Sequence, residues 1–376
     1  MNPPSSVQFE IDHAIENPAW DELVARSPGV HHEQTTVWAA RKRHHGWQAY
    51  RILVREHGRL IGGAQVLHRR ALKLTSIGFI SRGPIAESAE SIALVTQQVI
   101  AGLKITAHGY LVLLPSYIWT DIVPVLIANG FHAKPDMLMP DHLVTATTVV
   151  DLRQDLETIL ARMNESTRSC IRRGIKRGIE IGQGTAADID TMHQRMCQLC
   201  ARREIVPEPA SAKEFHDIWE CLAPRGMVKL FVSRYQSETI SAGLSFVYGE
   251  NMLAAKTGWS GEHPELFPNH MKLWEMIKWA KASGLKQLDL HHLVPAHAKA
   301  VLRGEELVDD GYSGVTKFKL GFGGDIIVIP DSYYRSFNRA GQAALKLGGA
   351  KLLARGRIQR VVNRLSRNVP RWHWIG

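Results

Sequence analysis

The residues best suited to chemistry lie in one short motif near the C-terminal end, Phe318-Lys319-Leu320-Gly321-Phe322-Gly323-Gly324. Its lysine stands between aromatic residues, and its three glycines predict that the chain bends tightly at this point. A cation held at such a bend can stabilise the negative charge that develops on a carbonyl oxygen, or it can bind a phosphate. The motif therefore predicts a site that handles one of these two groups.

Histidines and cysteines supply weaker candidates. His292 follows an apolar strand and is the histidine best placed for a general base near the motif, with a purely structural role as the alternative. His193, Cys197 and Cys200 recur at helical spacing, but the sequence offers no fourth ligand at a telling distance. Because buried cysteines on an apolar helix face are common, we predict no metal site.

The elements that must position these residues form a pattern that occurs twice. Residues 50–67 and 228–247 each contain two β-rich runs joined by a short polar turn, which is typical of a β-hairpin. In each half a helical stretch, 92–106 or 271–282, then ends at a glycine and leads into an apolar strand. The repeated order indicates an internal duplication. We predict a mixed α/β fold of two similar domains.

Length and composition agree with two domains of a cytoplasmic protein. The 376 residues are 45% hydrophobic and 22% charged, which is ordinary for a soluble chain. The sequence shows neither a run of 18 apolar residues nor a signal-peptide pattern, and its four cysteines do not make a disulfide framework. We place the first domain at 1–150 together with 325–376, and the second at 151–324.

The excess of positive charge is concentrated near the C-terminal end. Ten of the 46 lysine and arginine residues follow Asp331 without an acidic residue among them, and the net charge of the whole chain is also +10. In a helical tail, Arg357, Arg360 and Arg364 would share one face. Such a face suits RNA or an anionic membrane surface, and the alternative is a solvated helix docked on the protein.

A second basic segment spans residues 162–177. Arg168, Arg172 and Lys176 recur every four residues and would line one face of a helix. We interpret them as a binding face for a phosphate-rich ligand such as tRNA, with a solvated face as the alternative.

Seven short motifs occur in an order that resembles the Fem-type aminoacyltransferases, which build the interpeptide bridges of bacterial peptidoglycan and carry two GNAT-like domains. The motifs are Trp38 with Lys42 and Gly46-Trp47; Ser81-Arg82-Gly83-Pro84; Val149–Leu152; Thr167–Arg172 with Gly178; Trp279-Ala280 with Gly284; Leu288-Asp289-Leu290; and Phe318–Gly324. Each motif is weak alone. Together they cover roughly residues 35–335 and indicate membership of this superfamily.

The resemblance implies that an amine of an acceptor attacks the ester of an aminoacyl-tRNA and forms an amide, with the aminoacyl-tRNA as co-substrate and no other cofactor. The ester is already activated, so the enzyme must position the amine and stabilise the oxyanion. By the same resemblance, Lys319 is expected to stabilise the oxyanion and Phe318 to shape the pocket. The expected acceptor is a peptidoglycan precursor or, as a variant, a small metabolite or antibiotic precursor.

The resemblance also implies where the acceptor binds. Lys42 beside Trp38 is expected to contact an acceptor phosphate, and either Arg202 or Arg203 is expected to supply a second contact. Two further motif residues, Arg82 and Asp289, are assigned to substrate binding as well.

The sequence departs from the family pattern after Asp289. His291-His292 replaces a glycine there, and the 18-residue stretch Val294–Gly311 is expected to be a loop that borders the acceptor site. The chain also has no room for the helical-hairpin arm that some members carry.

Two other function classes stay open. A CoA-dependent N-acyltransferase would bind pyrophosphate on a glycine-rich turn that opens a helix. Residues 59–64 fit the letters of that turn but lie inside a predicted hairpin. A non-catalytic protein that binds RNA or a membrane through its basic tail is the other class.

Overall fold

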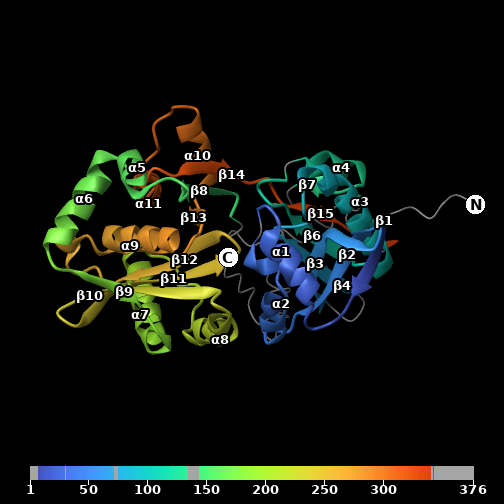
Figure 1. Cartoon of the computed structure of the whole chain (residues 1–376), viewed down its shortest axis with the longest axis horizontal. Coiled ribbons are helices and arrows are strands. Elements are labelled where there is room, and N and C mark those ends of the chain that lie inside the picture. Colours follow the sequence, from blue (N-terminus) through green and yellow to red (C-terminus); the bar gives the residue numbers. More distant parts are fainter. Residues whose placement is uncertain are drawn as a thin grey trace, which may run out of the picture. The chain divides into compact units, whose positions relative to one another are not determined.

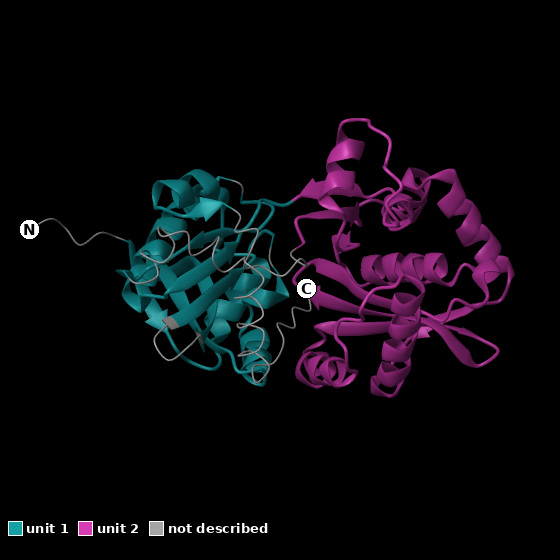
Figure 2. Ribbon diagram, turned by 180° about the vertical axis from the view of Figure 1, so that it is seen from behind, with its two compact units in different colours: residues 1–143, 329–372 teal, residues 144–328, 373–376 magenta. Residues whose placement is uncertain are grey.

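The computed structural model describes residues 7–29, 31–71, 75–119, 121–133, 144–339 and 342. These residues divide into two compact units (Figure 2). Of the described residues, 7–133 and 329–342 belong to unit 1, and Val144–Val328 form unit 2. The predicted domain limits were 150 and 324. Two strands near those limits, β8 (Ala146–Asp151) and β14 (Asp325–Val328), belong to the sheet of unit 2.

Unit 1 is built on a mixed sheet with the strand order β1-β2-β3-β4-β6-β15-β7, and β5 pairs with β3. Its strands are β1 (Val7–Asp12), β2 (Gln48–Glu56), β3 (Arg59–Ala71), β4 (Thr75–Ser81), β5 (Ile85–Ala86), β6 (Tyr110–Leu114), β7 (His132–Ala133) and β15 (Tyr333–Arg335). Its helices are α1 (Pro18–Arg26), α2 (Thr36–Arg43), α3 (Ala89–Thr106), α4 (Ile122–Ala128) and the 3-10 turn η1 (His32–Gln34).

Unit 2 is built on a second mixed sheet, ordered β14-β8-β13-β12-β11-β10-β9. Its remaining strands are β9 (Glu180–Gln183), β10 (Val228–Tyr235), β11 (Glu238–Tyr248), β12 (Asn251–Trp259) and β13 (Gln287–Asp289). Its helices are α5 (Leu156–Arg162), α6 (Glu165–Lys176), α7 (Ile189–Arg202), α8 (Lys213–Leu222), α9 (Pro268–Ala282), α10 (Pro295–Leu302) and α11 (Ser313–Leu320), with 3-10 turns η2 (Ala186–Asp188), η3 (Ala223–Arg225) and η4 (Pro264–Leu266). In Figure 1, α9 covers one face of this sheet, and α7 and α8 cover the other.

The element order predicted for each half is confirmed (Figure 1). Strands β2 and β3 form an antiparallel hairpin, as do β10 and β11. Helices α3 and α9 then lead into β6 and β13, each of which pairs parallel with a strand that precedes its helix. This mixed α/β plan confirms the predicted fold class.

The parallel strand pairs of the two units differ in how far the strands stay paired. In unit 1, β4 and β6 pair along residues 77–81 and 110–114. In unit 2, β12 pairs with β13 only through residues 251–253, although β12 continues to Trp259. The two strands therefore separate. Among the described strands, the second half of β12 is paired on one side only, with β11.

One local expectation for the C-terminal part of unit 2 was wrong, and the bend expected after Lys319 is present. The stretch Val294–Gly311 is not all loop, because α10 occupies Pro295–Leu302. Lys319 lies on the last turn of α11, and the bend follows it. At that bend Gly323 has a φ of +73°, and a Cβ there would come within 2.4 Å of Arg162 O. The glycines of the motif thus let the chain pack closely behind the lysine.

Candidate functional site

A cavity of about 370 Å³ lies in unit 2 beside the point where β12 and β13 separate. One wall comes from the unpaired side of β12, and another from Leu290 and His291, which follow β13. Helices α9 and α11 supply most of the remaining lining, including Phe318 and Lys319. A parallel pair that splits in this way leaves a wedge between its strands, and the cavity occupies that wedge.

Lys319 is fixed at the wall of this cavity. Its Nζ donates hydrogen bonds to the carbonyl oxygens of His292 at 2.7 Å and His291 at 3.1 Å. An ammonium group has three N–H donors, so one remains for a ligand. Burial lowers the pKa of Lys319 to about 8, with Asp289 raising it and Arg203 lowering it. At neutral pH the side chain is therefore a positioned cation.

Asp289 supports this lysine through the backbone. Its Oδ1 accepts hydrogen bonds from the backbone N–H of His291 at 2.6 Å and from Thr147 Oγ1. His291 adopts a φ of +61°, which turns the chain sharply after β13. The carboxylate thus positions the two carbonyl groups that hold Lys319. The sequence had assigned Asp289 to substrate binding, whereas these bonds give it a positioning role.

His292 contributes its carbonyl oxygen to this arrangement, and the histidine that lines the cavity after β13 is His291. The general-base role expected of the His292 ring therefore has no support from the cavity lining. A third histidine, His270, also lines the cavity and was missed in the sequence. Its ring lies edge-on to Phe318 at 4.9 Å, and burial lowers its pKa to about 4, so it is neutral at neutral pH.

A second lysine, Lys272 of α9, lies at the cavity wall and is 2% exposed. Four acceptors lie within hydrogen-bonding distance of the three N–H donors on its Nζ: Ser241 Oγ (2.8 Å), Ala242 O (2.9 Å), Thr257 Oγ1 (2.6 Å) and Asn269 Oδ1 (3.3 Å). Burial lowers its pKa to about 7, while these four acceptors stabilise its charged form. Lys272 was also missed in the sequence. The available signal was its position four residues before the apolar Met276, which places both side chains on the same, buried face of α9.

The charged residues that line the cavity are basic. They are Arg203, Lys256, Lys272 and Lys319, and among the described residues the lining contains neither aspartate nor glutamate. Either Arg202 or Arg203 was expected to contact a phosphate. Arg203 lines the cavity, whereas Arg202 donates to the carbonyl oxygens of Ser260 (2.5 Å) and Trp259 (2.7 Å). The cavity is suited to a ligand with anionic or developing negative charge.

The predicted acceptor-binding residues of unit 1 form a separate buried cluster. Trp38, Lys42 and Arg82 are 0%, 3% and 9% exposed, and Lys42 Nζ lies 4.7 Å from the centroid of the Trp38 ring. Glu33 is the carboxylate in their midst. Burial raises its pKa, while a hydrogen bond from Ser81 and the charges of Lys42, Arg82 and Arg41 lower it.

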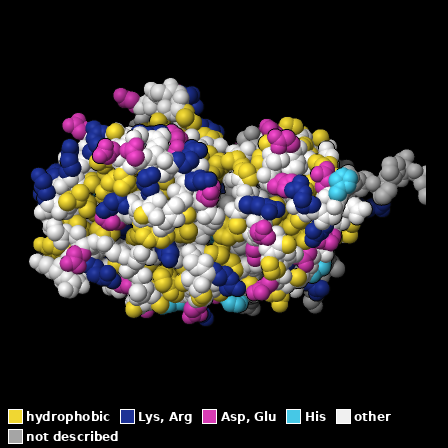
Figure 3. Space-filling model, in the orientation of Figure 1, with side chains coloured by type: hydrophobic (Ala, Val, Ile, Leu, Met, Phe, Trp, Pro, Cys, Tyr) yellow, Lys and Arg dark blue, Asp and Glu magenta, His cyan; other side chains and the backbone are white. Residues whose placement is uncertain are grey.

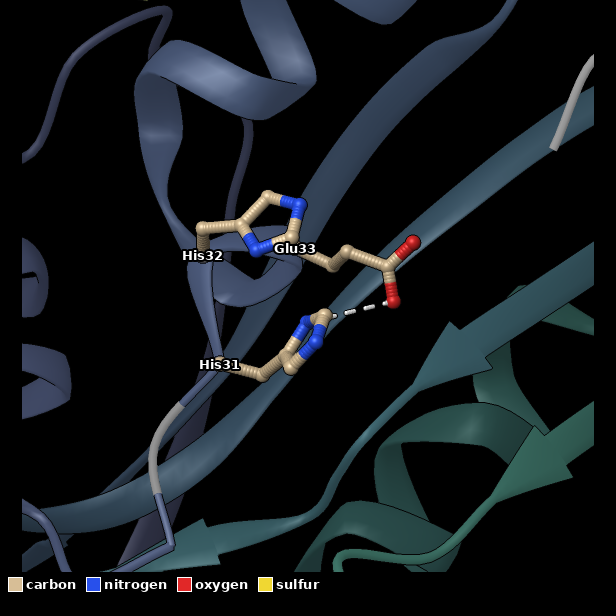
Figure 4. A group of neighbouring side chains, drawn as sticks. All are labelled: His31, His32 and Glu33. Atoms are coloured by element: carbon tan, nitrogen blue, oxygen red, sulfur yellow. Dashed lines mark ion pairs between the residues drawn. The ribbon is translucent and has the colours of Figure 1, made fainter. Parts of the chain in front are cut away.

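Two histidines adjoin this cluster (Figure 4). His31, His32 and Glu33 each offer a ligand atom, all within 4.8 Å of one another, and His31 Nδ1 lies 3.4 Å from Glu33 Oε2. Two imidazoles and a carboxylate are a donor set that zinc accepts. The positive charges of Lys42 and Arg82 beside Glu33 act against a metal cation at this position.

The predicted tRNA-binding residues of α6 differ in exposure and in their hydrogen-bond partners. Arg168 folds back, and its Nη1 donates to the carbonyl oxygens of Ala161 (3.1 Å) and Met163 at the end of α5. Arg172 and Lys176 are exposed. The other three, Arg357, Arg360 and Arg364, lie outside the described residues.

Comparison with known proteins identifies relatives of this chain. Residues 163–299 match the family model described as an acetyltransferase (GNAT) domain. The lipid II:glycine glycyltransferase of Staphylococcus saprophyticus is 25% identical over 236 residues, which are 60% of this chain and 56% of that protein. The enzyme of the same name from Staphylococcus aureus is 27% identical over 231 residues, 58% and 53% of the two chains. This chain thus spans a little over half the length of these relatives.

Solved structures share the fold. The crystal structure of FemX superposes with a TM-score of 0.75 at 19% identity and covers 88% of this chain and 98% of its own. A conserved protein of unknown function from Bacteroides thetaiotaomicron superposes with a TM-score of 0.53 at 12% identity, covering 87% and 98%. In the described ranges, none of the helices has the length and apolar content that a membrane crossing requires. Residues 163–299 thus match a GNAT domain, and the ordered motifs, the tandem sheets and the similarity to the glycyltransferases support the resemblance of this chain to the Fem-type family.

Proposed function

We propose that this protein is an aminoacyltransferase that moves an amino acid from an aminoacyl-tRNA to an amine of an acceptor and forms an amide. The observation that carries the proposal is Lys319, a cation fixed by two carbonyl groups at the wall of a cavity lined by basic and apolar side chains. The relatives named lipid II:glycine glycyltransferase support a peptidoglycan precursor as the acceptor.

In the proposed reaction the ester carbonyl of the aminoacyl-tRNA enters the cavity with its oxygen beside Lys319 Nζ. The neutral amine attacks the carbonyl carbon, and the electron pair of the C=O bond moves onto oxygen, where the ammonium group stabilises it. Collapse re-forms the carbonyl and breaks the ester C–O bond. The proton lost by the amine nitrogen goes to the departing ribose oxygen, which leaves an amide and uncharged tRNA.

The acceptor site is assigned to unit 1. Lys42 and Arg82 are buried cations whose charges act on the carboxylate of Glu33, and cations fixed in this way support binding of an anionic acceptor. Trp38 holds Lys42 in place through its ring. A lipid-linked acceptor would bring the protein to the cytoplasmic face of the membrane.

The alternative CoA-dependent reaction has one argument in its favour, the match to an acetyltransferase domain. The segment that fits the pyrophosphate turn, Arg59–Ala64, lies within β3 (Arg59–Ala71), so it does not open a helix. Phosphate binding at such a turn depends on the helix N-terminus. The two reactions therefore differ in their acyl donor, and the experiment must identify which donor is consumed.

The test supplies the purified protein with charged tRNA, uncharged tRNA or acetyl-CoA, together with a panel of peptidoglycan precursors. Mass spectrometry of the acceptor should show the mass of one amino acid residue added only with charged tRNA. Consumption of acetyl-CoA with an acetylated product would replace the proposed donor by CoA.

Lys319→Met tests the site itself. Loss of the oxyanion donor should lower kcat by about 10²- to 10³-fold, with an unchanged circular dichroism spectrum. Lys317→Met is the matched control, because Lys317 lies on the same helix α11 and is exposed. Equal turnover of the Lys319 variant and the wild type would remove the oxyanion role.

A further inference from the structure

We propose that one face of α6 and the aromatic rim of the unit 2 cavity form the entry path for the single-stranded 3′ end of an RNA. Arg172, Arg173, Lys176 and Arg177 would bind its phosphates, and Phe267 with Trp259 would stack its last bases. This inference rests on the proposed function and deepens it, because it names the surface that receives the tRNA end.

The first observation is a strip of exposed positive charge, formed by Arg172, Arg173, Lys176 and Arg177. Across the part of the chain that the structure describes, none of the four lies within ion-pair distance of a carboxylate. Figure 3 shows Lys and Arg side chains along the edge of unit 2 where α6 lies in Figure 1. Solvated cations in a row are the usual means of tracking a nucleic-acid backbone.

The second observation is that α6 is held close to the cavity. Asn164 caps the helix by accepting from the Thr167 N–H at 2.8 Å, and α6 packs against α9, which lines the cavity. Gly174 allows this contact, because a Cβ there would come within 2.5 Å of Met271 Cγ. The basic strip therefore has a fixed place beside the cavity wall.

Phe267 joins the strip to the cavity. The guanidinium carbons of Arg173 and Arg177 lie 4.8 Å and 5.7 Å from its ring centroid, and the same ring lines the cavity. Arg177 also donates to the backbone oxygen of Glu265, just before Phe267. A half-buried ring flanked by two cations offers a stacking surface at the point where a bound phosphate chain would reach the cavity.

Trp259 offers a second, rigid surface at the end of β12. Its indole lines the cavity, and its Nε1 donates to Glu262 O at 3.0 Å. Arg202 lies 5.1 Å from its ring centroid and donates to its backbone oxygen, so the ring is held on one side by a cation. Exposed cations followed by aromatic rings and then by a basic cavity match the chemistry of a single-stranded RNA end.

The test measures binding of the full-length protein to an uncharged RNA hairpin that carries the acceptor stem and 3′ overhang of a tRNA, by fluorescence anisotropy over a salt series. The double variant Arg173→Gln/Arg177→Gln should reduce the slope of log affinity against log salt by about 1.4, which is roughly 0.7 for each phosphate that is no longer neutralised. Arg303→Gln is the control, because Arg303 is exposed and pairs with Glu305, and it should leave the slope unchanged.

Stacking is tested separately with Phe267→Leu, which should weaken binding roughly 5- to 150-fold. A second measurement removes the overhang from the RNA, so its first result comes from the wild type alone. The same hairpin without its overhang should bind the wild type more weakly, and it should bind wild type and Phe267→Leu equally. An overhang that makes no difference to the wild type would overturn the proposal.

The remaining outcomes separate the competing explanations. An unchanged salt slope in the double variant overturns the path. The path is also overturned if the double variant keeps RNA binding but loses binding to phosphatidylglycerol vesicles, because the basic strip would then be a membrane-binding surface. Aminoacyl transfer with an unchanged KM for charged tRNA in the double variant would leave the proposed function standing and the path wrong. RNA binding as expected, without transfer from charged tRNA, would leave the path standing and the function wrong.

Discussion

Lys319 owes its chemical character to its neighbours as much as to its own side chain. Two backbone carbonyl groups fix its Nζ, and burial lowers its pKa to about 8. The carboxylate of Asp289 acts in the opposite direction and favours the charged form. A cation poised in this way can share its proton with a developing oxyanion more readily than a lysine in water can.

This pKa gives the reaction a defined pH dependence. Lys319 is charged below pH 8 and loses its proton as the pH rises through about 8, so kcat should fall on the alkaline side. Asp289→Asn keeps a hydrogen-bonding oxygen but removes the charge that raises the lysine pKa. The alkaline limb of the pH–kcat profile should therefore move to lower pH.

The control for that measurement is Asp151→Asn. Asp151 lies at the end of the neighbouring strand β8, and its partner is the exposed Arg153 at 2.8 Å. This variant should leave the alkaline limb in place. A limb that does not move in Asp289→Asn would show that another group controls it.

At this scale the sequence predicted some residues and missed others for physical reasons. Phe318 and Lys319 could be found because the glycines that follow them are rare in combination. Lys272 and His270 could not, because α9 carries several polar and charged residues, and only contacts with β11, β12 and α11 distinguish these two. Local spacing carries little information about such long-range contacts.

The secondary-structure elements of unit 2 position the cavity beside Lys319. Hairpins β2–β3 and β10–β11 were predictable because alternating apolar residues and a two-residue polar turn are local signals. The separation of β12 from β13 was not, since it depends on a strand pairing that ends after Leu253 and Asp289. The same holds for α10, which lies where the sequence suggested a loop.

The contact of α6 with α9 can be tested through glycine. Gly174→Ala adds a Cβ that would meet Met271 at 2.5 Å, and overpacking of this kind costs about 1–3 kcal/mol, against a gain of at most about 1 kcal/mol in helix propensity. We expect a lower unfolding free energy in urea. Gly314→Ala in α11 meets nothing within 4 Å and should raise stability by up to about 1 kcal/mol. Equal effects of the two changes would contradict the close packing.

At the scale of the whole molecule, the described residues of unit 2 form one continuous stretch of chain, and those of unit 1 do not. The buried residues of the main core of unit 2, from Val150 to Phe322, all lie within that stretch. The core of unit 1 takes in Tyr333, which the chain reaches only after completing unit 2. The repeated pattern in the sequence marks two units, but it does not specify the strands at their limits, because β8 and β14 have only 6 and 4 residues.

This division predicts that unit 2 folds alone. A fragment of residues 144–328 should unfold in one cooperative transition, because its sheet and core are complete. A fragment of residues 1–143 lacks β15 and should show a broad, weakly cooperative transition. Denaturant titration followed by circular dichroism distinguishes the two. A non-cooperative 144–328 fragment would contradict the independence of its core.

The position of β15 has a consequence for biosynthesis. This strand pairs with β6 on one side and β7 on the other, so it fills a place between two strands that the ribosome releases some two hundred residues earlier. Until translation reaches Tyr333, the nascent chain exposes an unfilled slot, while the intervening segment already has everything it needs to fold. Unit 2 should therefore fold before unit 1, although most of unit 1 is synthesised earlier. Unit 1 should depend on chaperones until β15 occupies its place between β6 and β7.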